Sequence, residues 1–587
     1  MKQVLIVITC ITLAAGVAAS AQVKDFKPVT DEMLLHPNPG DWLMPSRTYD
    51  WQRFSPLDEI NKQNVGQLRM AWSRGMASGI SENIPMVYAG VMYVVNPGAV
   101  IQALDATNGD LIWEYQRKLP ADAKNFLGEG MRTRNLAIYD DTVLYTTPDG
   151  YLVALDARTG KVRWETQTHD YHLRSQHTSG PIVVDGKVIS PRSCPNPETT
   201  RAGCFIAAHD ARTGKELWRF YGTPAPGEPG GDSWGDVPLE QRMASFWGLP
   251  GSYDPVRKLI YWGVANPAPY TRIKRHNGNP DAVSRSAPAD LYSNSTLALD
   301  PQTGKLAWYY QHLPGDDWDS DFAHERILLR TAINPDPAAL KWINPLIPRG
   351  QQRDILVTVG EPGGIFALDR DKGEFVWATP FPYDSPDYIL SNIDVETGKT
   401  YINWDRVFKE DGEKHTICFL NTKSYWPMAY SPARNSLFLP YTDVCGSMTA
   451  NSRIQQGATR ETVARPGSDP NNLSGLASMD MATGKILWRH TQYAPSQGAV
   501  LATAGDLVFW GDMDRRFRAF DAGTGKVLWE TILGSSIQTS TITYAVGGKQ
   551  YVAVLTGEGQ VTLYPQFPKI KVPRTHNAIY VFALPGQ

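Results

Sequence analysis

The sequence lacks the features that mark several large classes of protein. Beyond residue 21, no stretch is long and apolar enough to span a bilayer. No tract of Lys or Arg stands out, and 57 basic residues nearly balance 60 acidic ones, for a net charge of −3. Nucleic acid and anionic membrane surfaces are therefore not expected partners. The chain also has no glycine-rich phosphate loop and no nucleophile elbow.

The first 21 residues have the pattern of a secretory signal peptide. Lys2 precedes an apolar run over residues 4–17, and Ala19-Ser20-Ala21 resembles a cleavage site before Gln22. We therefore expect an exported, periplasmic protein whose mature part begins near residue 22. That mature part, residues 22–587, is predicted to form a single domain.

Cysteine is scarce, with five in 587 residues, and none stands in the Cys-x-x-Cys-His pattern that attaches c-type haem. Cys10 lies in the predicted signal peptide, which leaves four cysteines in an oxidising compartment. Four cysteines permit three connectivities. The simplest is two local disulfides, which join Cys194 to Cys204 and Cys418 to Cys445.

What the chain does contain is one phrase repeated seven times, in which Asp is followed by Gly four residues later and by Trp eight residues later. Fixed phrases on variable spacers indicate a repeat architecture. The seven copies span residues 105–113, 156–164, 210–218, 300–308, 369–377, 480–488 and 521–529.

Each copy predicts a β-hairpin. The Asp carboxylate can accept backbone N–H groups of a tight turn, and the Gly supplies a positive φ. The flanking residues alternate or run apolar, which suits strands. One hairpin cannot bury its own face, so the copies must pack radially, with the Trp side chains between them. We therefore predict an all-β, eight-bladed β-propeller; a linear β-solenoid is the alternative.

The spacing between copies is uneven, at 51, 54, 90, 69, 111 and 41 residues, whereas a four-stranded blade needs roughly 40–50. The two long gaps are predicted to hold large loops or a degenerate eighth blade. Residues 252–264 and 429–441 have the pattern of additional hairpins there. The C-terminal residues 577–585 are predicted to form a strand that closes the ring against an N-terminal strand.

The densest acidic cluster is PGDDWDSDFAHE, residues 314–325. Asp319 and Asp321 are two residues apart, so an extended backbone places both on one face. Two such carboxylates repel each other unless a cation or proton lies between them, and hard cations such as Ca²⁺ prefer oxygen ligands. A solvated acidic loop is the alternative. The repeat context favours a site.

The repeats and this cluster together resemble the pyrroloquinoline quinone (PQQ)-dependent alcohol dehydrogenases, the methanol and ethanol quinoprotein dehydrogenases. The resemblance covers essentially the whole mature chain. Further segments that are similar to the family are SPLDEINKQNVGQLRMAW (55–72), FWGLPGSYDP (246–255), VANPAPY (264–270) and NAIYVFALP (577–585).

The resemblance implies a reacting centre. Asp319 falls on the family's catalytic Asp, which takes the alcohol proton while hydride passes to the quinone. Asn266, Asp319 and a Glu are implied metal ligands, and Glu198 is the nearest candidate for that Glu, although it needs a one-residue insertion. Asp321 matches the additional Asp of the lanthanide-dependent branch. The implied metal is thus a lanthanide(III), with Ca²⁺ as the alternative.

The resemblance also implies a cradle for the PQQ rings and carboxylates. Trp247 falls on the indole that stacks under the quinone. Glu82, Arg134 and Thr178 match residues that contact the cofactor, and a guanidinium fork suits a carboxylate.

Three departures place the chain away from the methanol enzymes. The adjacent-cysteine disulfide over the quinone is replaced by Gly128-Glu129, Pro362 stands where the family has an Arg, and the metal-ligand Glu is displaced. A larger or different alcohol is the expected consequence.

The sequence therefore predicts an exported PQQ-dependent enzyme that oxidises an alcohol to an aldehyde or ketone. Because it has no haem motif, a separate cytochrome c is the expected electron acceptor, and a homodimer stays open. The alternative is a non-catalytic propeller scaffold that binds partner proteins. A scaffold has no need of Glu82, Trp247, Asn266, Asp319 and Asp321 together.

Overall fold

A computed structural model describes residues 23, 26–128, 131–194, 201–418, 421–538, 540–559, 567–573 and 576–586. The predicted signal peptide and Glu198 lie outside these ranges. Strands dominate, and the α-helices are single short turns: α1 (Asp31–Leu35), α2 (Ala123–Leu127) and α3 (Arg272–Arg275). None of the described helices has the length and apolar character needed to cross a bilayer.

All seven repeats form the predicted hairpin turn. Each begins where a strand ends at Asp, as in β9 (Tyr151–Asp156), or one residue before it, as at Asp300. Each continues into a strand that carries Trp, as in β10 (Val162–Gln167). The carboxylate of Asp156 accepts the backbone N–H groups of Arg158 and Thr159 at 3.0 and 2.9 Å. In every copy the Gly has a positive φ of 69° to 79°, at Gly109, Gly160, Gly214, Gly304, Gly373, Gly484 and Gly525.

The Gly of one repeat also lies against the indole ring of the Trp in the repeat before it. A Cβ at Gly160 would lie 2.5 Å from the Trp113 ring, whose Nε1 donates to the carbonyl of Ala157 at 3.0 Å. A side chain at the glycine would thus displace the indole, so this position needs glycine for space as well as for φ. The predicted role of the tryptophans as aromatics packed between repeats is confirmed. Gly484 is the exception, because Leu340 occupies the place of an indole there.

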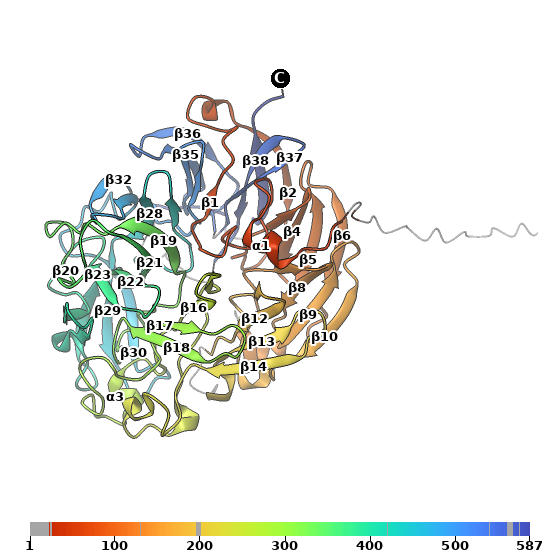
Figure 1. Ribbon diagram of the computed structural model, residues 1–587. Coiled ribbons are helices and arrows are strands. Elements are labelled where there is room, and N and C mark those ends of the chain that lie inside the picture. Colours follow the sequence, from red (N-terminus) through yellow and green to blue (C-terminus); the bar gives the residue numbers. More distant parts are fainter. Residues whose placement is uncertain are drawn as a thin grey trace, which may run out of the picture.

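Within the described residues, eight sheets of four or five strands lie one after another around a common centre, and seven of them each hold one repeat (Figure 1). In hydrogen-bonded order, the first four sheets are β3 (Met86–Tyr88), β4 (Val91–Asn96), β5 (Val100–Asp105), β6 (Leu111–Gln116); β7 (Ala137–Tyr139), β8 (Thr142–Thr146), β9, β10; β11 (Ile182–Val184), β12 (Lys187–Pro191), β13 (Phe205–Asp210), β14 (Glu216–Tyr221); and β15 (Ser252–Asp254), β16 (Leu259–Gly263), β17 (Ser295–Leu299), β18 (Leu306–Gln311).

The other four sheets use the rest of the repeats and both ends of the chain. They are β19 (Ile327–Ala332), β21 (Gln352–Val359), β22 (Ile365–Asp369), β23 (Phe375–Thr379), β20 (Trp342–Ile343); β27 (Ala429–Ser431), β28 (Ser436–Thr442), β31 (Ser474–Asp480), β32 (Ile486–Gln492); β1 (Phe54–Ser55), β33 (Leu501–Thr503), β34 (Leu507–Gly511), β35 (Arg516–Asp521), β36 (Val527–Ile532); and β37 (Ile542–Val546), β38 (Lys549–Thr556), β39 (Ala578–Ala583), β2 (Arg69–Gly75).

The last of these sheets joins the two ends of the chain. β39 pairs antiparallel with β2, which confirms the prediction that residues 577–585 form a strand against an N-terminal strand. Trp72 of β2 packs on Gly109 as a repeat tryptophan would. The eighth sheet therefore does not lie in a long gap. The hairpins at 252–264 and 429–441 exist, but they are the first two strands of sheets that end in repeat copies.

The longest gap holds two small extra sheets instead. One pairs β24 (Leu390–Ile393) with β25 (Thr400–Ile402). The other, which we call the inserted sheet, orders β26 (Lys414–Cys418), β29 (Val444–Ala450) and β30 (Ala458–Ala464). Cys418 and Cys445 face each other across it and form a disulfide. Cys194 and Cys204 form the second, so both predicted pairings are confirmed.

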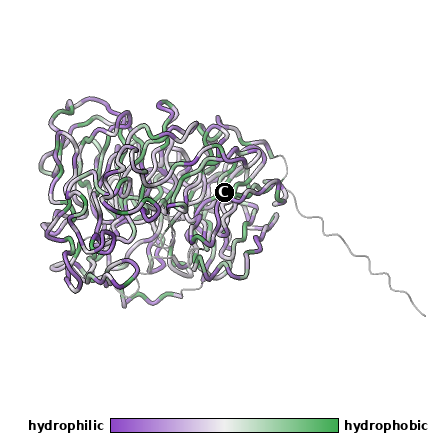
Figure 2. Tube along the Cα trace, turned by 90° about the horizontal axis from the view of Figure 1, so that it is seen from below, coloured by the Kyte–Doolittle hydropathy of each residue, from purple (hydrophilic) through white to green (hydrophobic). Residues whose placement is uncertain are grey.

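Apolar residues are spread through the whole body of the molecule, not gathered in one segment (Figure 2). Eight tryptophans are among its largest fully buried side chains, as expected where sheets pack face to face.

Candidate active site

The predicted site residues come from equivalent places in successive sheets. Each precedes the first strand of its sheet by a few residues: Glu82 precedes β3, Arg134 β7, Thr178 β11, Trp247 β15 and Asp321 β19. Since those first strands lie side by side around the centre, the segments before them converge at one end. The contacts described next show that they meet there.

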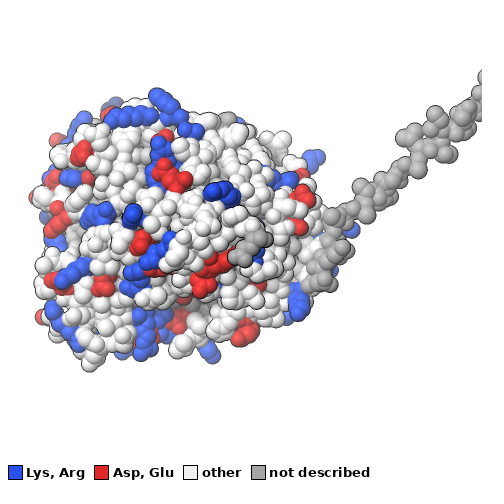
Figure 3. All heavy atoms as spheres, turned by 90° about the horizontal axis from the view of Figure 1, so that it is seen from above, with Lys and Arg blue, Asp and Glu red and all other residues white. Residues whose placement is uncertain are grey.

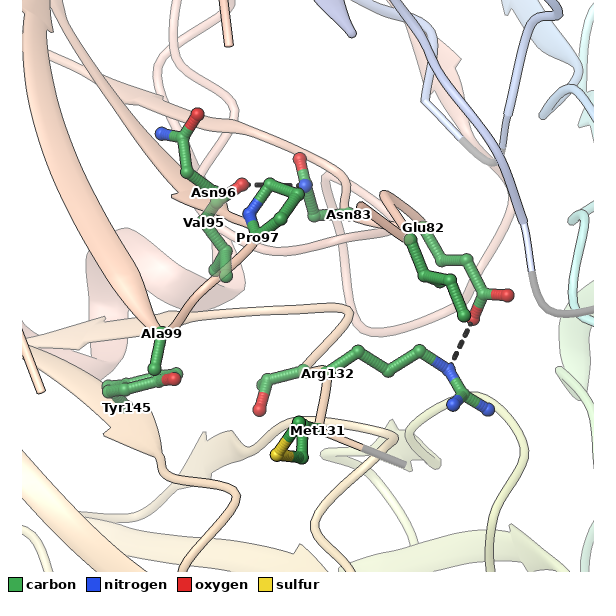
Figure 4. A pocket seen from close by; sticks show the side chains of 11 residues that line it. Glu82, Asn83, Val95, Asn96, Pro97, Ala99, Met131, Arg132 and Tyr145 are labelled. Atoms are coloured by element: carbon green, nitrogen blue, oxygen red, sulfur yellow. Dashed lines mark hydrogen bonds and ion pairs between the residues drawn. The ribbon is translucent and has the colours of Figure 1, made fainter. Parts of the chain in front are cut away.

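Glu82 is buried and holds two guanidinium groups. Its Oε2 lies 2.9 Å from Nε of Arg132 and 2.8 Å from Nη2 of Arg134. Two cations on one carboxylate leave this side of the site electropositive. Glu82 and Arg132 also line a small pocket with Asn83, Asn96 and Tyr145, and Figure 4 shows the Glu82 carboxylate turned toward Arg132.

Trp247 is held by its backbone and by its indole. Its carbonyl accepts Arg134 Nη1 at 2.9 Å and Thr178 Oγ1 at 3.1 Å. Its Nε1 donates to Oδ2 of Asp321. The Arg134 guanidinium lies over the indole at 5.3 Å and over the Tyr425 ring at 4.6 Å. Arg134 Nε is buried and has no hydrogen-bond partner among the described residues, so an acceptor from a bound group would satisfy it.

The acidic loop 314–325 divides its aspartates between two roles. Asp316 accepts the backbone N–H groups of Trp318 and Ser320, and Asp317 accepts that of Phe408 at 2.7 Å. These two carboxylates shape the loop. Asp319 takes a positive φ of 66°, which is uncommon for a residue with a side chain and is found where the surroundings enforce it.

Asp321 is buried in the middle of the site. Its Oδ1 accepts the backbone N–H of Asn266 at 2.6 Å. Burial, and then the nearby Asp319 carboxylate, raise the pKa of Asp321 to about 8. A group perturbed by both desolvation and a like charge is typical of a functional site.

A further acid, Glu361, joins this centre. Burial and then Asp321 raise the pKa of Glu361 well above its ordinary value. Its Oε1 accepts the Ser424 hydroxyl at 2.5 Å and lies 3.5 Å from His324 Nε2. The His324 ring packs edge-on against Trp247 at 5.2 Å. The Asp319 carboxylate thus raises the pKa of both Asp321 and Glu361, and Asp321 raises that of Glu361 as well.

These donors fit a hard cation. Carboxylate oxygens and the side-chain carbonyl of Asn266 are the ligand type that Ca²⁺ and other hard ions prefer. In the described parts of the chain no three His, Cys, Asp or Glu side chains already converge on one point. The Trp247 face and the unpaired Nε of Arg134 likewise fit a flat polycarboxylate.

Comparison with known proteins identifies the family to which the chain belongs. The profile of the PQQ family, "Glucose/ethanol/alcohol dehydrogenase, beta-propeller domain", matches residues 42–380 and 473–552. The dehydrogenase subunit of the quinone alcohol dehydrogenase of Gluconacetobacter polyoxogenes is 30% identical over 98% of this chain and 80% of its own. The lanthanide-dependent methanol dehydrogenase of Methylorubrum extorquens is 30% identical over 94% and 92%. The chain belongs to the PQQ-dependent alcohol dehydrogenases.

Solved structures agree with this assignment. The quinohemoprotein alcohol dehydrogenase ADHIIG of Pseudomonas putida HK5 superimposes with a TM-score of 0.82 at 27% identity, over 96% of this chain and 83% of that one. This PQQ-dependent alcohol dehydrogenase is therefore an all-β propeller protein and an enzyme of alcohol oxidation, with PQQ and a metal as cofactors.

The structure brings together most of the residues predicted for this PQQ-dependent alcohol dehydrogenase, but their predicted roles stay predictions. Glu82, Arg134, Thr178, Trp247 and Asp321 are linked by direct contacts, and Asn266 touches Asp321 through its backbone N–H. Glu198 lies outside the described residues.

Sequence reasoning missed several members of the site, namely Arg132, His324, Glu361, Tyr425 and Arg460. None of these residues lies in a repeat. Position in the sequence did offer signals, because Arg132 is two residues before Arg134, Glu361 directly precedes Pro362, and the acidic loop contains His324 three residues after Asp321. The His324 ring is fully buried against Trp247, so it belongs to the packing of the site.

Proposed function

We propose that this protein is a periplasmic PQQ-dependent dehydrogenase that oxidises an alcohol to an aldehyde or ketone, with Asp319 as the general base. The observation that carries the proposal is the direct linkage of Trp247, Asp321 and Asn266 beside Asp319. When bound, PQQ with its metal supplies the hydride acceptor and a Lewis acid.

The chain's own groups then have distinct tasks. Asp319, whose side chain keeps 35% of its surface exposed, takes the hydroxyl proton of the alcohol. Asn266 and Asp321 offer oxygens to the metal, and Glu198 is the proposed further ligand. Trp247 offers a flat apolar face, while Arg134, Thr178 and Glu82 hold the polar rim of the cofactor.

We further propose that the metal is a lanthanide, with Ca²⁺ as the alternative. Asp321 adds a second carboxylate two residues from Asp319, and Glu361 adds a third. A trivalent ion has more charge to neutralise than a divalent one, so extra carboxylates favour it. The methanol dehydrogenase to which the chain is 30% identical is named lanthanide-dependent, which supports the choice.

The setting of the enzyme is part of the same proposal. We propose that the eight larger sheets are the blades of one closed propeller domain over residues 22–587, which follows a signal peptide over residues 1–21. Two disulfides suit an oxidising compartment such as the periplasm. Electrons pass to a separate cytochrome c, since no cysteine stands in a haem-attachment pattern. On the face shown in Figure 3, basic and acidic side chains are interspersed. A nucleic-acid partner is therefore not part of the proposal.

The test is reconstitution of the purified metal-free protein with PQQ, followed by dye-linked oxidation of a panel of alcohols with Ca²⁺, with La³⁺ or with neither. We expect turnover with La³⁺, and its selective loss in Asp321→Ala. Turnover with Ca²⁺ alone would contradict the proposal that the metal is a lanthanide. Absence of PQQ absorbance on the protein would contradict the proposal that it is a PQQ-dependent enzyme.

A further inference from the structure

The Asp319 carboxylate has a single hydrogen-bond and ion-pair partner within the described part of the chain. That partner is Arg460, whose Nη1 donates to Oδ2 of Asp319 at 2.9 Å. The other oxygen, Oδ1, has no protein partner among the described residues. Asp316 and Asp317, by contrast, are held by backbone N–H groups of their surroundings.

Arg460 comes from outside the repeats. It lies on β30, where it faces Met448 of β29 in the inserted sheet. The Cys418–Cys445 disulfide ties β29 to β26, and Tyr270 Oη donates to the carbonyl of Ala458 at the start of β30. The disulfide thus braces the inserted sheet internally, and Tyr270 ties its strand β30 to the segment that follows Asn266. From this braced sheet Arg460 reaches the acidic loop.

The contact between Arg460 and Asp319 changes the charge balance of the site. Asp319, Asp321 and Glu361 form a cluster of three carboxylates, and Asp319 and Glu361 both act on the Arg460 guanidinium. A guanidinium stays protonated and bonds carboxylates in a defined geometry, whereas Lys is a mobile point charge. A cation on Asp319 also repels a metal ion that enters the same cluster.

We propose that Arg460 is the counter-cation and positioning residue of Asp319. By binding Oδ2 it fixes the rotation of the carboxylate and leaves Oδ1 open to the hydroxyl proton of the alcohol. The proposal rests on the proposed function for its effect on turnover, but not for its effect on metal binding. Arg460 itself touches neither substrate nor cofactor in this role.

The first arm of the test is steady-state kinetics of the enzyme reconstituted with PQQ and metal. Arg460→Met should lower kcat about 10- to 100-fold with little change in KM, because a misaligned base slows the reaction more than it weakens binding. Arg460→Lys should recover part of kcat, since it restores the charge without the fork. Millimolar guanidinium chloride should partly rescue Arg460→Ala, because the site is open enough to admit it.

The second arm is titration of the metal-free protein with La³⁺ or Ca²⁺, followed by tryptophan fluorescence. Arg460→Met should bind the metal about 5- to 10-fold more tightly, since a neighbouring cation is gone. Arg453→Met is the matched control: Arg453 lies exposed in the β29–β30 connection, and its loss should leave the metal affinity and kcat unchanged.

The two arms separate the possible failures. Metal affinity that does not tighten in Arg460→Met overturns the proposal whatever happens to turnover, and a parallel fall of kcat, metal affinity and melting temperature means that Arg460 only supports the fold. An unchanged kcat in Arg460→Met overturns the positioning role. If the wild type binds PQQ and metal but oxidises no alcohol in the panel, the proposed function fails, and the metal arm alone decides the role of Arg460.

Discussion

The seven repeat turns and the acidic loop 314–325 use the same residue, aspartate, in opposite ways. In a repeat turn the carboxylate binds the backbone just after it, as Asp156 binds the N–H groups of Arg158 and Thr159. In the loop, Asp319 and Asp321 bind partners far away in the sequence, Arg460, Trp247 and Asn266. A carboxylate without local N–H partners depends on the tertiary structure and is free to serve another group.

The pKa values of the aspartates also differ between the repeat turns and the acidic loop, because they shift in opposite directions. Burial alone would raise the pKa of Asp156, but hydrogen bonds from Arg163 and Thr159 outweigh it and lower that pKa. For Asp321, burial and Asp319 act together and raise the pKa to about 8. Burial and neighbouring groups thus favour the anion at Asp156 of the turn and disfavour it at Asp321 of the site, where a bound cation would favour it.

The largest effect is expected at Asp319. Asp319→Ala should lower dye-linked alcohol oxidation about 10²- to 10⁴-fold, the usual contribution of a general base. Its melting temperature should stay close to that of the wild type, because the carboxylate is partly exposed and bonds one side chain. Retained turnover in this variant would show that Asp319 is not the general base.

Asp317→Ala is the contrasting variant in the same loop. It deprives the buried N–H groups of Arg272 and Phe408 of their acceptor, which should cost about 2–4 kcal/mol of unfolding free energy. Chemical denaturation checks this. Equal stability losses at Asp317 and Asp319 would contradict the division of the loop into structural and functional aspartates.

An effect of similar size, again on stability, is expected in the repeat turns. Gly160→Ala combines a positive φ of 70° with a clash against Trp113 and should cost about 2–4 kcal/mol. Gly227→Ala has a φ of 86° but no atom within 4 Å, and it should cost only about 1 kcal/mol. Thermal melts of the two variants measure the difference. Similar losses would show that the indole adjusts and that only the backbone conformation matters.

The smallest effect concerns pH. Because the pKa of Asp156 is lowered in the folded state, its ionised form adds stability above the unfolded value of 3.8, and this contribution disappears as the pH falls. Asp156→Asn keeps an acceptor for the turn but loses the ion pair with Arg163, so it should cost about 1 kcal/mol at neutral pH and less near about pH 3. A cost independent of pH would assign the effect to the turn geometry instead.

Much of the fold followed from patterns that are local in the sequence. The Asp-x-x-x-Gly turn, the strand on either side and the Trp packed on the next Gly depend on residues within one repeat and its neighbour. The pairing of residues 577–585 with an N-terminal strand was predicted correctly. The sheet that this pairing completes was not recognised as the eighth, because β39 and β2 carry no complete repeat. The inserted sheet was missed as well, since its strands β26 and β29 are separated by a hairpin of another sheet.

The site shows the same limit. Asp319 and Asp321 were found because two acids two residues apart are visible in the sequence, and the family resemblance supplied Trp247 and Asn266. Glu361 and Arg460 were not found, since Glu361 lies in the β21–β22 connection and Arg460 in the inserted sheet, and each meets the acidic loop only in three dimensions.

The sequence by itself determined the repeat, its turns and the placing of two carboxylates on one loop, because hydrogen bonds and chain geometry over a few residues dictate them. Only the tertiary structure decided which acids are buried together, which cation pairs with them and where the eighth sheet lies. Those outcomes depend on burial and charge summed over segments hundreds of residues apart, which no local pattern encodes.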